Sequence, residues 1–201
     1  MKSINEYRES YVTIDIETTG LDPQECSIIE LSAIRYESGI KVDKFSTLVR
    51  PHKFTTDKSG NEVYMALFIS QLTGITNEML REAPFIEDVL GSFRKFIRND
   101  VIVGHNIPFD ISFINKALLE YDGSQLYNEY IDTLELSRSF LPYLEHHSLK
   151  YMSEYFNVDY TGAHRSLKDC ELTNLCYLNL FIDQAMVDEN VQKKEELDLA
   201  I

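Results

Sequence analysis

The sequence lacks the features that mark secreted, membrane-spanning and zinc-binding proteins. No apolar run is long enough to span a bilayer, and the N-terminus has no apolar stretch typical of a secretory signal. The three cysteines form no CxxC pair, so neither a disulfide framework nor a zinc site is indicated. No repeat or Pro/Gly/Ser-rich linker divides the chain. These absences predict a cytoplasmic protein with no membrane partner, in which residues 1–185 form a single domain and residues 186–201 a loosely held acidic tail.

An excess of basic residues is also lacking. The chain has 19 Lys and Arg against 33 Asp and Glu, giving a net charge of −14. Nucleic-acid binders are usually basic, because Lys and Arg displace the counterions of phosphates. The charge alone therefore disfavours a nucleic-acid partner, and solubility is a sufficient explanation of the acidic balance.

The hydrophobic pattern predicts an α/β fold with a mixed sheet flanked by helices. Three strands without an intervening helix, over residues 11–16, 28–36 and 44–49, indicate an antiparallel meander. Helical spacing then begins near Phe85, and a short buried strand follows over residues 101–104. Further helices are expected over residues 108–120, 148–156 and 166–183. The polar residues 52–64 are typical of a surface loop.

The first motif, DIETTG, begins at Asp15. Side chains alternate along a strand, so Asp15 and Glu17 share one face while Ile14 and Ile16 take the other. Two carboxylates at the end of a buried strand repel each other and lose hydration. A divalent cation removes both penalties, and oxygen ligands suit Mg²⁺ or Mn²⁺. The alternative is that the strand ends there and both acids face water.

The second motif, GHNIPFD, places Asp110 in the first turn of a helix that Pro108 is suited to begin. The helix dipole favours an acid at this position without any function, so a metal role and a purely structural role both remain open.

The third motif, HRSLKD, runs from His164 to Asp169. Ser166 and Asp169 have the spacing of a capping box, which explains Asp169 without a metal. His164 lies just before the helix, and histidine is the residue type best suited to act as a general base near neutral pH. The alternative for His164 is an ordinary surface histidine.

Together, the three motifs resemble the DEDDh branch of the ribonuclease H-like 3′–5′ exonuclease superfamily, which includes the proofreading (epsilon) subunits of bacterial replicative polymerases. They occur in the family's order, and the segment from Leu72 to Met79 is similar to a family segment between the first two motifs. Two departures are Thr73, where the family often has a histidine, and a long stretch over residues 52–64.

The resemblance implies a metal-dependent hydrolase that acts on the 3′ end of single-stranded nucleic acid, with DNA favoured over RNA. Two divalent ions, Mg²⁺ or Mn²⁺, are expected on four acids, with His164 as general base. The predicted catalytic residues are Asp15, Glu17, Asp110, His164 and Asp169, of which the four acids are the metal ligands.

The resemblance further implies that Thr18, Thr19 and Gly20 contact the terminal nucleotide, Thr18 and Thr19 through backbone N–H groups. Phe109 either stacks on a base or belongs to the core. A DNA polymerase subunit is a candidate partner. Two other interpretations remain: an exoribonuclease, and a binding or scaffold protein that has lost activity.

Overall fold

The structure is a computed structural model that describes residues 1–199, with side chains described to residue 185. The strands are β1 (Lys2–Ser3), β2 (Ser10–Thr18), β3 (Ile28–Glu37), β4 (Ile40–Leu48), β5 (Thr55–Thr56), β6 (Glu62–Val63), β7 (Ile102–Gly104) and β8 (Glu129–Asp132). The helices are α1 (Leu67–Thr73), α2 (Asn77–Arg81), α3 (Ile86–Ile97), α4 (Ile107–Asp122), α5 (Thr133–Phe140), α6 (Leu149–Tyr155) and α7 (Ser166–Leu199).

One mixed sheet has the strand order β1-β8-β7-β2-β3-β4. Strands β2, β3 and β4 form the predicted antiparallel meander, whereas β7 runs parallel to β2, β8 parallel to β7, and β1 parallel to β8. Strand β2 therefore lies in the centre of the sheet, between an antiparallel and a parallel neighbour. The predicted α/β class with a mixed sheet is confirmed.

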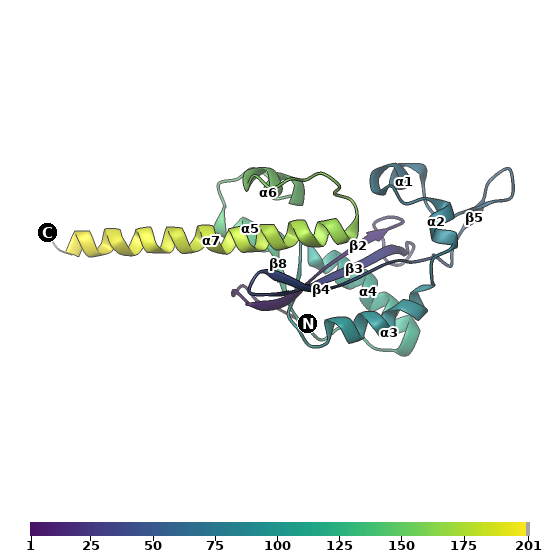
Figure 1. Cartoon of the computed structure of the whole chain (residues 1–201), viewed down its shortest axis with the longest axis horizontal. Coiled ribbons are helices and arrows are strands. Elements are labelled where there is room, and N and C mark those ends of the chain that lie inside the picture. The colour runs from purple at the N-terminus through teal and green to yellow at the C-terminus, as the bar shows by residue number, and fades with distance from the viewer. Residues whose placement is uncertain (200–201) are drawn as a thin grey trace.

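Helices cover both faces of this sheet (Figure 1). On one face, Val12, Ile14 and Ile16 of β2 pack in a core with side chains of α3 and α4, such as Phe93 and Ile114. On the other face, β2 and β3 pack in a second core with side chains of α5, α6 and α7. Because both faces are buried, a polar side chain on β2 remains accessible only where the strand leaves the covering helices.

The differences from the predicted elements lie mostly in polar or short segments. Strand β4 begins at Ile40 rather than near residue 44, and the segment 52–64, predicted as a surface loop, contains the short hairpin β5–β6. Helices α1, α2 and α5 were not predicted. Short elements such as these bury too few side chains to produce a clear hydrophobic period.

Helix α7 is longer than predicted. It begins at Ser166 as expected but continues to Leu199 instead of ending near residue 183, and its C-terminal part extends beyond the sheet (Figure 1). A helical backbone to residue 199 differs from a loosely held tail. Residues 200–201 lie outside the described residues, as do the side chains from residue 186 onward, so the division at residue 185 remains a prediction.

Candidate active site

The C-terminal end of β2 carries two of the predicted site carboxylates. Asp15 and Glu17 lie on the face covered by α7, opposite Ile14 and Ile16, which are buried against α3 and α4. A shift of register between Glu17 and Thr18 interrupts the regular pairing with β3. Both acids remain partly exposed. The strand period therefore places two carboxylates side by side where a ligand can reach them.

The first turn of α7 brings a third carboxylate to the same place. One oxygen each of Asp15, Glu17 and Asp169 lie within 4.8 Å of one another. Asp169 is buried, and its Oδ2 accepts a hydrogen bond from the backbone N–H of His164 at 3.1 Å. Its Oδ1 is buried without a hydrogen-bond partner among the described residues. This oxygen lacks the partner that a buried acceptor normally has.

Asp110 lies near the cluster, in the first turn of α4. Strand β7 pairs with β2 only at Val12 and Thr13, so the N–H of Ile16 lies beyond its end. Asp110 Oδ1 accepts a hydrogen bond from that N–H at 3.0 Å, and the side chain is buried. Asp110 lies outside the group of three but near enough for its charge to act on Asp15. Its position is therefore more specific than a favourable helix dipole requires.

Burial, together with the crowding of these acids, raises their pKa values. Burial raises the pKa of Asp15 well above its usual range, and the charges of Asp110 and Asp169 add to this effect. Burial also raises the pKa of Glu17 to about 8, with contributions from Asp169 and Glu30. The pKa of Asp169 rises to about 6, mainly through burial. The folded chain thus holds negative charges together at a cost that a cation would relieve.

His164 lies at the edge of this cluster, two residues before α7 begins. Its backbone is in the left-handed region, with φ of 65°, and its N–H is held by Asp169. The imidazole is partly buried, and the ring of Tyr160 packs edge-on at a centroid distance of 6.1 Å. The left-handed turn allows the chain to place His164 beside Asp169 and then enter the helix.

The predicted substrate-binding residues adjoin the same end of β2. Thr18 Oγ1 donates to Gly20 O at 2.7 Å, which shapes the turn after the strand. The N–H of Thr19 donates to Ser27 O at 2.9 Å, and Thr19 Oγ1 accepts from the N–H of Ser27. The Thr19 amide predicted to face the substrate is therefore engaged within the loop, because the β2–β3 connection closes on itself.

Phe109 on α4 packs against the core and is also partly exposed, so its role toward a base stays a prediction. The ring is partly exposed, yet it packs against the core and lies 5.0 Å from the ring of Phe113, measured between centroids. A single aromatic side chain at this position can contribute to the core with one face and offer the other to a base.

Sequence reasoning missed the residues that hold the second motif in place. Asp132 Oδ1 accepts hydrogen bonds from the N–H groups of Asn106 at 2.8 Å and Leu134 at 3.0 Å. His105 Nδ1 lies 3.0 Å from Thr133 Oγ1, and burial lowers the pKa of His105 to about 4. The sequence signal for Asp132 is an aspartate at the end of an apolar segment, because aspartate is a favoured N-cap residue and so indicates the start of a helix.

A second group that sequence reasoning missed is the pair Glu30 and Arg165. Glu30 is a buried acid of β3, opposite Glu17 in the strand register, and Arg165 directly follows His164. No local pattern links two residues this far apart in the chain.

The residues at this site fit a divalent cation. Three carboxylates from β2 and α7 converge, one buried oxygen lacks a partner, and their pKa values are raised by burial and mutual repulsion. Hard oxygen donors are the ligands that Mg²⁺ and Mn²⁺ prefer. The arrangement is that of a metal-binding acidic cluster.

Comparison with known proteins places the chain in a family. A family model described as Exonuclease matches residues 12–177. The chain belongs to this exonuclease family. It is 40% identical over 171 residues to the DNA polymerase III subunit epsilon of Aquifex aeolicus, covering 85% of this chain and 80% of that subunit. It is also 37% identical over 193 residues to DNA polymerase III PolC-type of Bacillus subtilis, covering 94% of this chain but 12% of that protein.

Solved structures share the fold. The nuclease domain of 3′hExo, a DEDDh family member, bound to rAMP, superposes with a TM-score of 0.73 at 20% identity, covering 90% of this chain and 95% of that one. Exonuclease I of E. coli in complex with a dT13 oligonucleotide superposes with a TM-score of 0.71 at 16% identity, covering 91% of this chain and 43% of that one.

These matches confirm the predicted membership of the DEDDh exonucleases and the ribonuclease H-like fold. The chain is a 3′-to-5′ exonuclease, and the interpretation as a binding or scaffold protein is not supported. Within the residues that the structure describes, no helix is both long and apolar enough to traverse a bilayer.

Proposed function

We propose that this exonuclease degrades single-stranded DNA from its 3′ end to nucleoside 5′-monophosphates, in proofreading or repair. The observation that carries the proposal is the convergence of Asp15, Glu17 and Asp169, with Asp110 adjacent and His164 at the rim. The similarity to a polymerase epsilon subunit along most of its length supports DNA as the substrate. Three cysteines that form no disulfide support a cytoplasmic location.

In this proposal, the four acids hold two divalent ions, Mg²⁺ or Mn²⁺. Asp15 would serve both ions, Glu17 and Asp169 would complete one site, and Asp110 would contribute to the other. The bound ions would supply stabilisation of the charge that develops on the scissile phosphate. His164 accepts the proton from the attacking water as general base. The Asp169 carboxylate orients His164 through its backbone N–H.

The terminal nucleotide is proposed to lie against the turn formed by Thr18, Thr19 and Gly20 and against the exposed face of Phe109. The hydrogen bonds within this turn make it a preformed surface. Stacking on Phe109 accepts any base, which suits an enzyme that must remove every nucleotide in turn.

The experiment that tests the proposal is a degradation time course on DNA and RNA oligomers of the same sequence, each labelled at the 5′ or the 3′ end. We expect stepwise shortening of 5′-labelled DNA, immediate release of a labelled mononucleotide from the 3′ end, and slower loss of RNA. Faster degradation of RNA would support the exoribonuclease instead, because the 2′-hydroxyl is the group that distinguishes the two substrates. No hydrolysis of either oligomer would contradict the assigned activity.

We expect the metal-free protein to lose stability as the pH rises from 4 to 8. The pKa values of Asp169 (about 6) and Glu17 (about 8) exceed those of carboxyls in an unfolded chain (about 4). Between these limits the folded state binds more protons than the unfolded state, so its stability falls with rising pH. The measurement is the melting temperature in chelator at pH 6 and pH 8.

Addition of Mg²⁺ at pH 8 should raise the melting temperature again, since the cation replaces the missing protons as counter-charge. The Asp15→Asn variant is the control and should show a smaller dependence on pH. A wild-type melting temperature that is equal at the two pH values in chelator would show that the raised pKa values of these acids do not lower the stability of the fold.

A polymerase subunit is the proposed partner. The chain spans 11–13% of the PolC-type polymerases that it matches, so in those proteins a similar segment forms part of a polymerase. Most of the described basic side chains here already pair with carboxylates, including Arg165 beside the cluster and Lys53 in the loop before β5. The isolated chain therefore offers little basic surface to retain a DNA strand, and a tethered polymerase would raise the effective concentration of its 3′ end.

We accordingly expect the isolated protein to bind single strands weakly and to release them after each cut. A slope of log affinity against log salt no steeper than about −2 is expected, equivalent to two or three phosphate contacts at about −0.7 each. The measurement is a salt titration of oligonucleotide binding by the Asp15→Asn variant, with a trap assay of processivity on the wild type. A much steeper slope, or long processive digestion, would remove the need for a partner.

A further inference from the structure

Glu30 is a buried carboxylate outside the set of proposed metal ligands. It lies on β3, directly opposite Glu17, and is 2% exposed. An ionised carboxylate is costly to bury unless it is paired and hydrogen-bonded. Glu30 therefore requires partners that compensate for the burial of its carboxylate.

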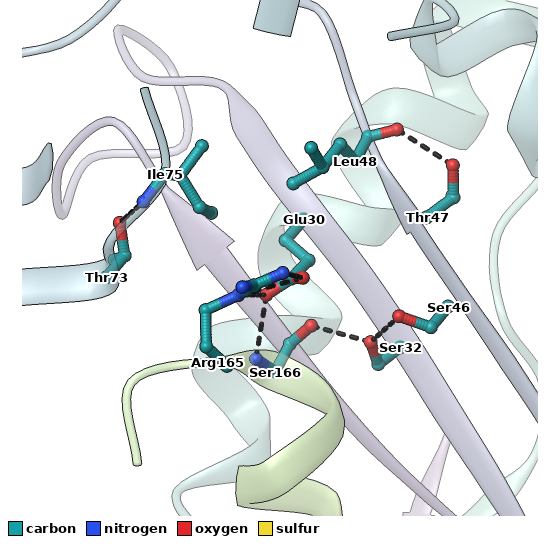
Figure 2. A network of polar contacts seen from close by, with 9 residues as sticks. All are labelled: Glu30, Ser32, Ser46, Thr47, Leu48, Thr73, Ile75, Arg165 and Ser166. Atoms are coloured by element: carbon teal, nitrogen blue, oxygen red, sulfur yellow. Dashed lines mark hydrogen bonds and ion pairs between the residues drawn. The ribbon is translucent and has the colours of Figure 1, made fainter. Parts of the chain in front are cut away.

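Glu30 is held by the residues that directly follow His164. Arg165 Nη2 donates to Glu30 Oε1 at 2.6 Å, and Arg165 Nε lies 3.2 Å from both carboxylate oxygens. The backbone N–H of Ser166 donates to Oε2 at 2.9 Å. Figure 2 shows the guanidinium of Arg165 lying along the Glu30 carboxylate, with Ser166 just below it. One acid of β3 thus binds both the side chain before α7 and the first N–H of the helix.

A chain of hydroxyls continues this attachment along the sheet. Ser166 Oγ donates to Ser32 Oγ at 2.7 Å, and Ser32 Oγ donates to Ser46 Oγ of β4 at 2.9 Å (Figure 2). Glu30 and Ser32 are two residues apart on β3 and therefore face the same side. The start of α7 is consequently attached to two successive positions of one strand.

His164 is consequently held in place by two sets of hydrogen bonds. On its C-terminal side, Arg165 and Ser166 are bound to β3, and its own N–H is bound to Asp169 in the first turn of α7. Strand β3 is in turn in register with β2, which carries Asp15 and Glu17. These bonds relate the position of His164 to the carboxylates of β2 through one short path.

We propose that Glu30 and Arg165 are a positioning pair, which fixes His164 and Asp169 relative to Asp15 and Glu17 and thereby sets the rate of hydrolysis. The inference rests on the proposed function of these site residues. Stability alone is a weak reason for the pair, because replacing a buried ion pair by apolar residues is often neutral or stabilising. A geometric role explains why the pair adjoins His164.

The chain offers a matched control for an ordinary bridge between helix and sheet. Lys41 of β4 and Glu171 of α7 form an ion pair at 2.6 Å, which also joins α7 to the sheet. This second pair is more exposed: the Glu171 side chain is 36% accessible and that of Glu30 is 3% accessible. A role that any bridge can perform would be shared by both pairs, whereas positioning of His164 would belong to the Glu30–Arg165 pair alone.

The test measures turnover, KM and the Mg²⁺ concentration for half-maximal rate in Arg165→Ala, Arg165→Lys and Lys41→Ala. We expect kcat to fall about 10- to 100-fold in Arg165→Ala, the usual range for loss of an outer partner of a catalytic site, with little change in KM. Arg165→Lys should remain slow, because an ammonium cannot reproduce the fork of Nε and Nη2. Lys41→Ala should keep the wild-type kcat.

The Glu30→Gln/Arg165→Ala double variant separates geometry from charge, because it removes both charges and leaves an acceptor for the Ser166 N–H. We expect it to stay slow. Recovery of the wild-type rate would show that Arg165 only cancels the charge of Glu30, and equal losses in Lys41→Ala and Arg165→Ala would show a general structural bridge. Either result overturns the proposal.

Hydrogen exchange of the His164 amide gives a readout that needs no activity. We expect exchange to accelerate at least about tenfold in Arg165→Ala and to remain unchanged in Lys41→Ala. Only the first substitution loosens the segment in which the His164 N–H donates to Asp169. If the wild type hydrolyses no nucleic acid, the proposed function fails while this exchange still tests the positioning. Unchanged exchange in Arg165→Ala would overturn the positioning pair.

Discussion

Asp15→Asn is expected to reduce hydrolysis to background while the protein remains folded. Asp15 is the acid whose charge interacts with Asp110, Asp169 and Glu17 together, so its removal affects both proposed ions. Metal ions at such sites contribute several kcal/mol of stabilisation in the transition state, which corresponds to a loss of about 10³-fold or more. Asparagine keeps the shape of the side chain, so the change removes charge without creating a cavity.

The same substitution should stabilise the metal-free fold. Burial and mutual repulsion raise the pKa values of these carboxyls, and one fewer acid removes part of both costs. We therefore expect a higher melting temperature than the wild type in chelator at pH 8, and a smaller gain on addition of Mg²⁺. A residual rate above about a tenth of the wild type would be incompatible with the role assigned to Asp15.

Asp43→Asn is the matched control for this experiment. Asp43 is an exposed acid of β4, and the change of one carboxylate to an amide is chemically identical. It should leave both the rate and the response to Mg²⁺ unchanged. In the wild type, a chelator should abolish hydrolysis and Mg²⁺ or Mn²⁺ should restore it. Hydrolysis that persists in chelator would contradict metal dependence for the whole site.

The positions of the site acids could be predicted because each depends on a local pattern. The strand period fixes the shared face of Asp15 and Glu17. Pro108 marks the start of α4 and so places Asp110 in its first turn. The capping-box spacing after His164 likewise places Asp169 in the first turn of α7. The order of the three motifs, which matches that of the family, then indicates that these elements meet in space. Local sequence patterns alone do not indicate this.

Contacts between distant segments could not be predicted in this way. Glu30 and Arg165 are 135 residues apart, and nothing in either neighbourhood indicates that an acid near the start of an apolar strand binds the residue before a distant helix. The same holds for Asp132, which supports the turn at Asn106 across 26 residues. A buried charge in a strand is itself a signal, however, because it requires a partner that the sequence does not name.

The β2–β3 connection shows a further limit. Thr19 was expected to offer its amide to the substrate, but the loop folds so that this amide bonds to Ser27. Backbone groups have no side-chain identity, so their partners become known only from the path of the chain. For the same reason the polar segment 52–64 gave no sign of the hairpin β5–β6.

His164→Asn is expected to lower turnover by about 10²- to 10⁴-fold, the range for loss of a positioned general base. Asparagine is the informative substitution because His164 has φ of 65°, a left-handed conformation that asparagine adopts more readily than most residues. His164→Ala would add backbone strain to the loss of the imidazole. A larger loss of rate in the alanine variant than in the asparagine variant would therefore measure the contribution of the turn itself.

Three further measurements distinguish a base from a ligand or a structural residue. The Mg²⁺ concentration for half-maximal rate should change little in His164→Asn, because the proposed ligands are the carboxylates of β2, α4 and α7. Added imidazole should restore part of the rate in this variant and none in Asp15→Asn, since a free base can replace a missing proton acceptor but not a missing metal ligand. The melting temperature should stay near that of the wild type. Two results would instead assign His164 a structural role in the site. One is a collapse of Mg²⁺ affinity, and the other is a loss of rate that accompanies a loss of stability and that imidazole does not relieve. Neither is expected of a general base, because a base contributes to the reaction only through the proton that it accepts.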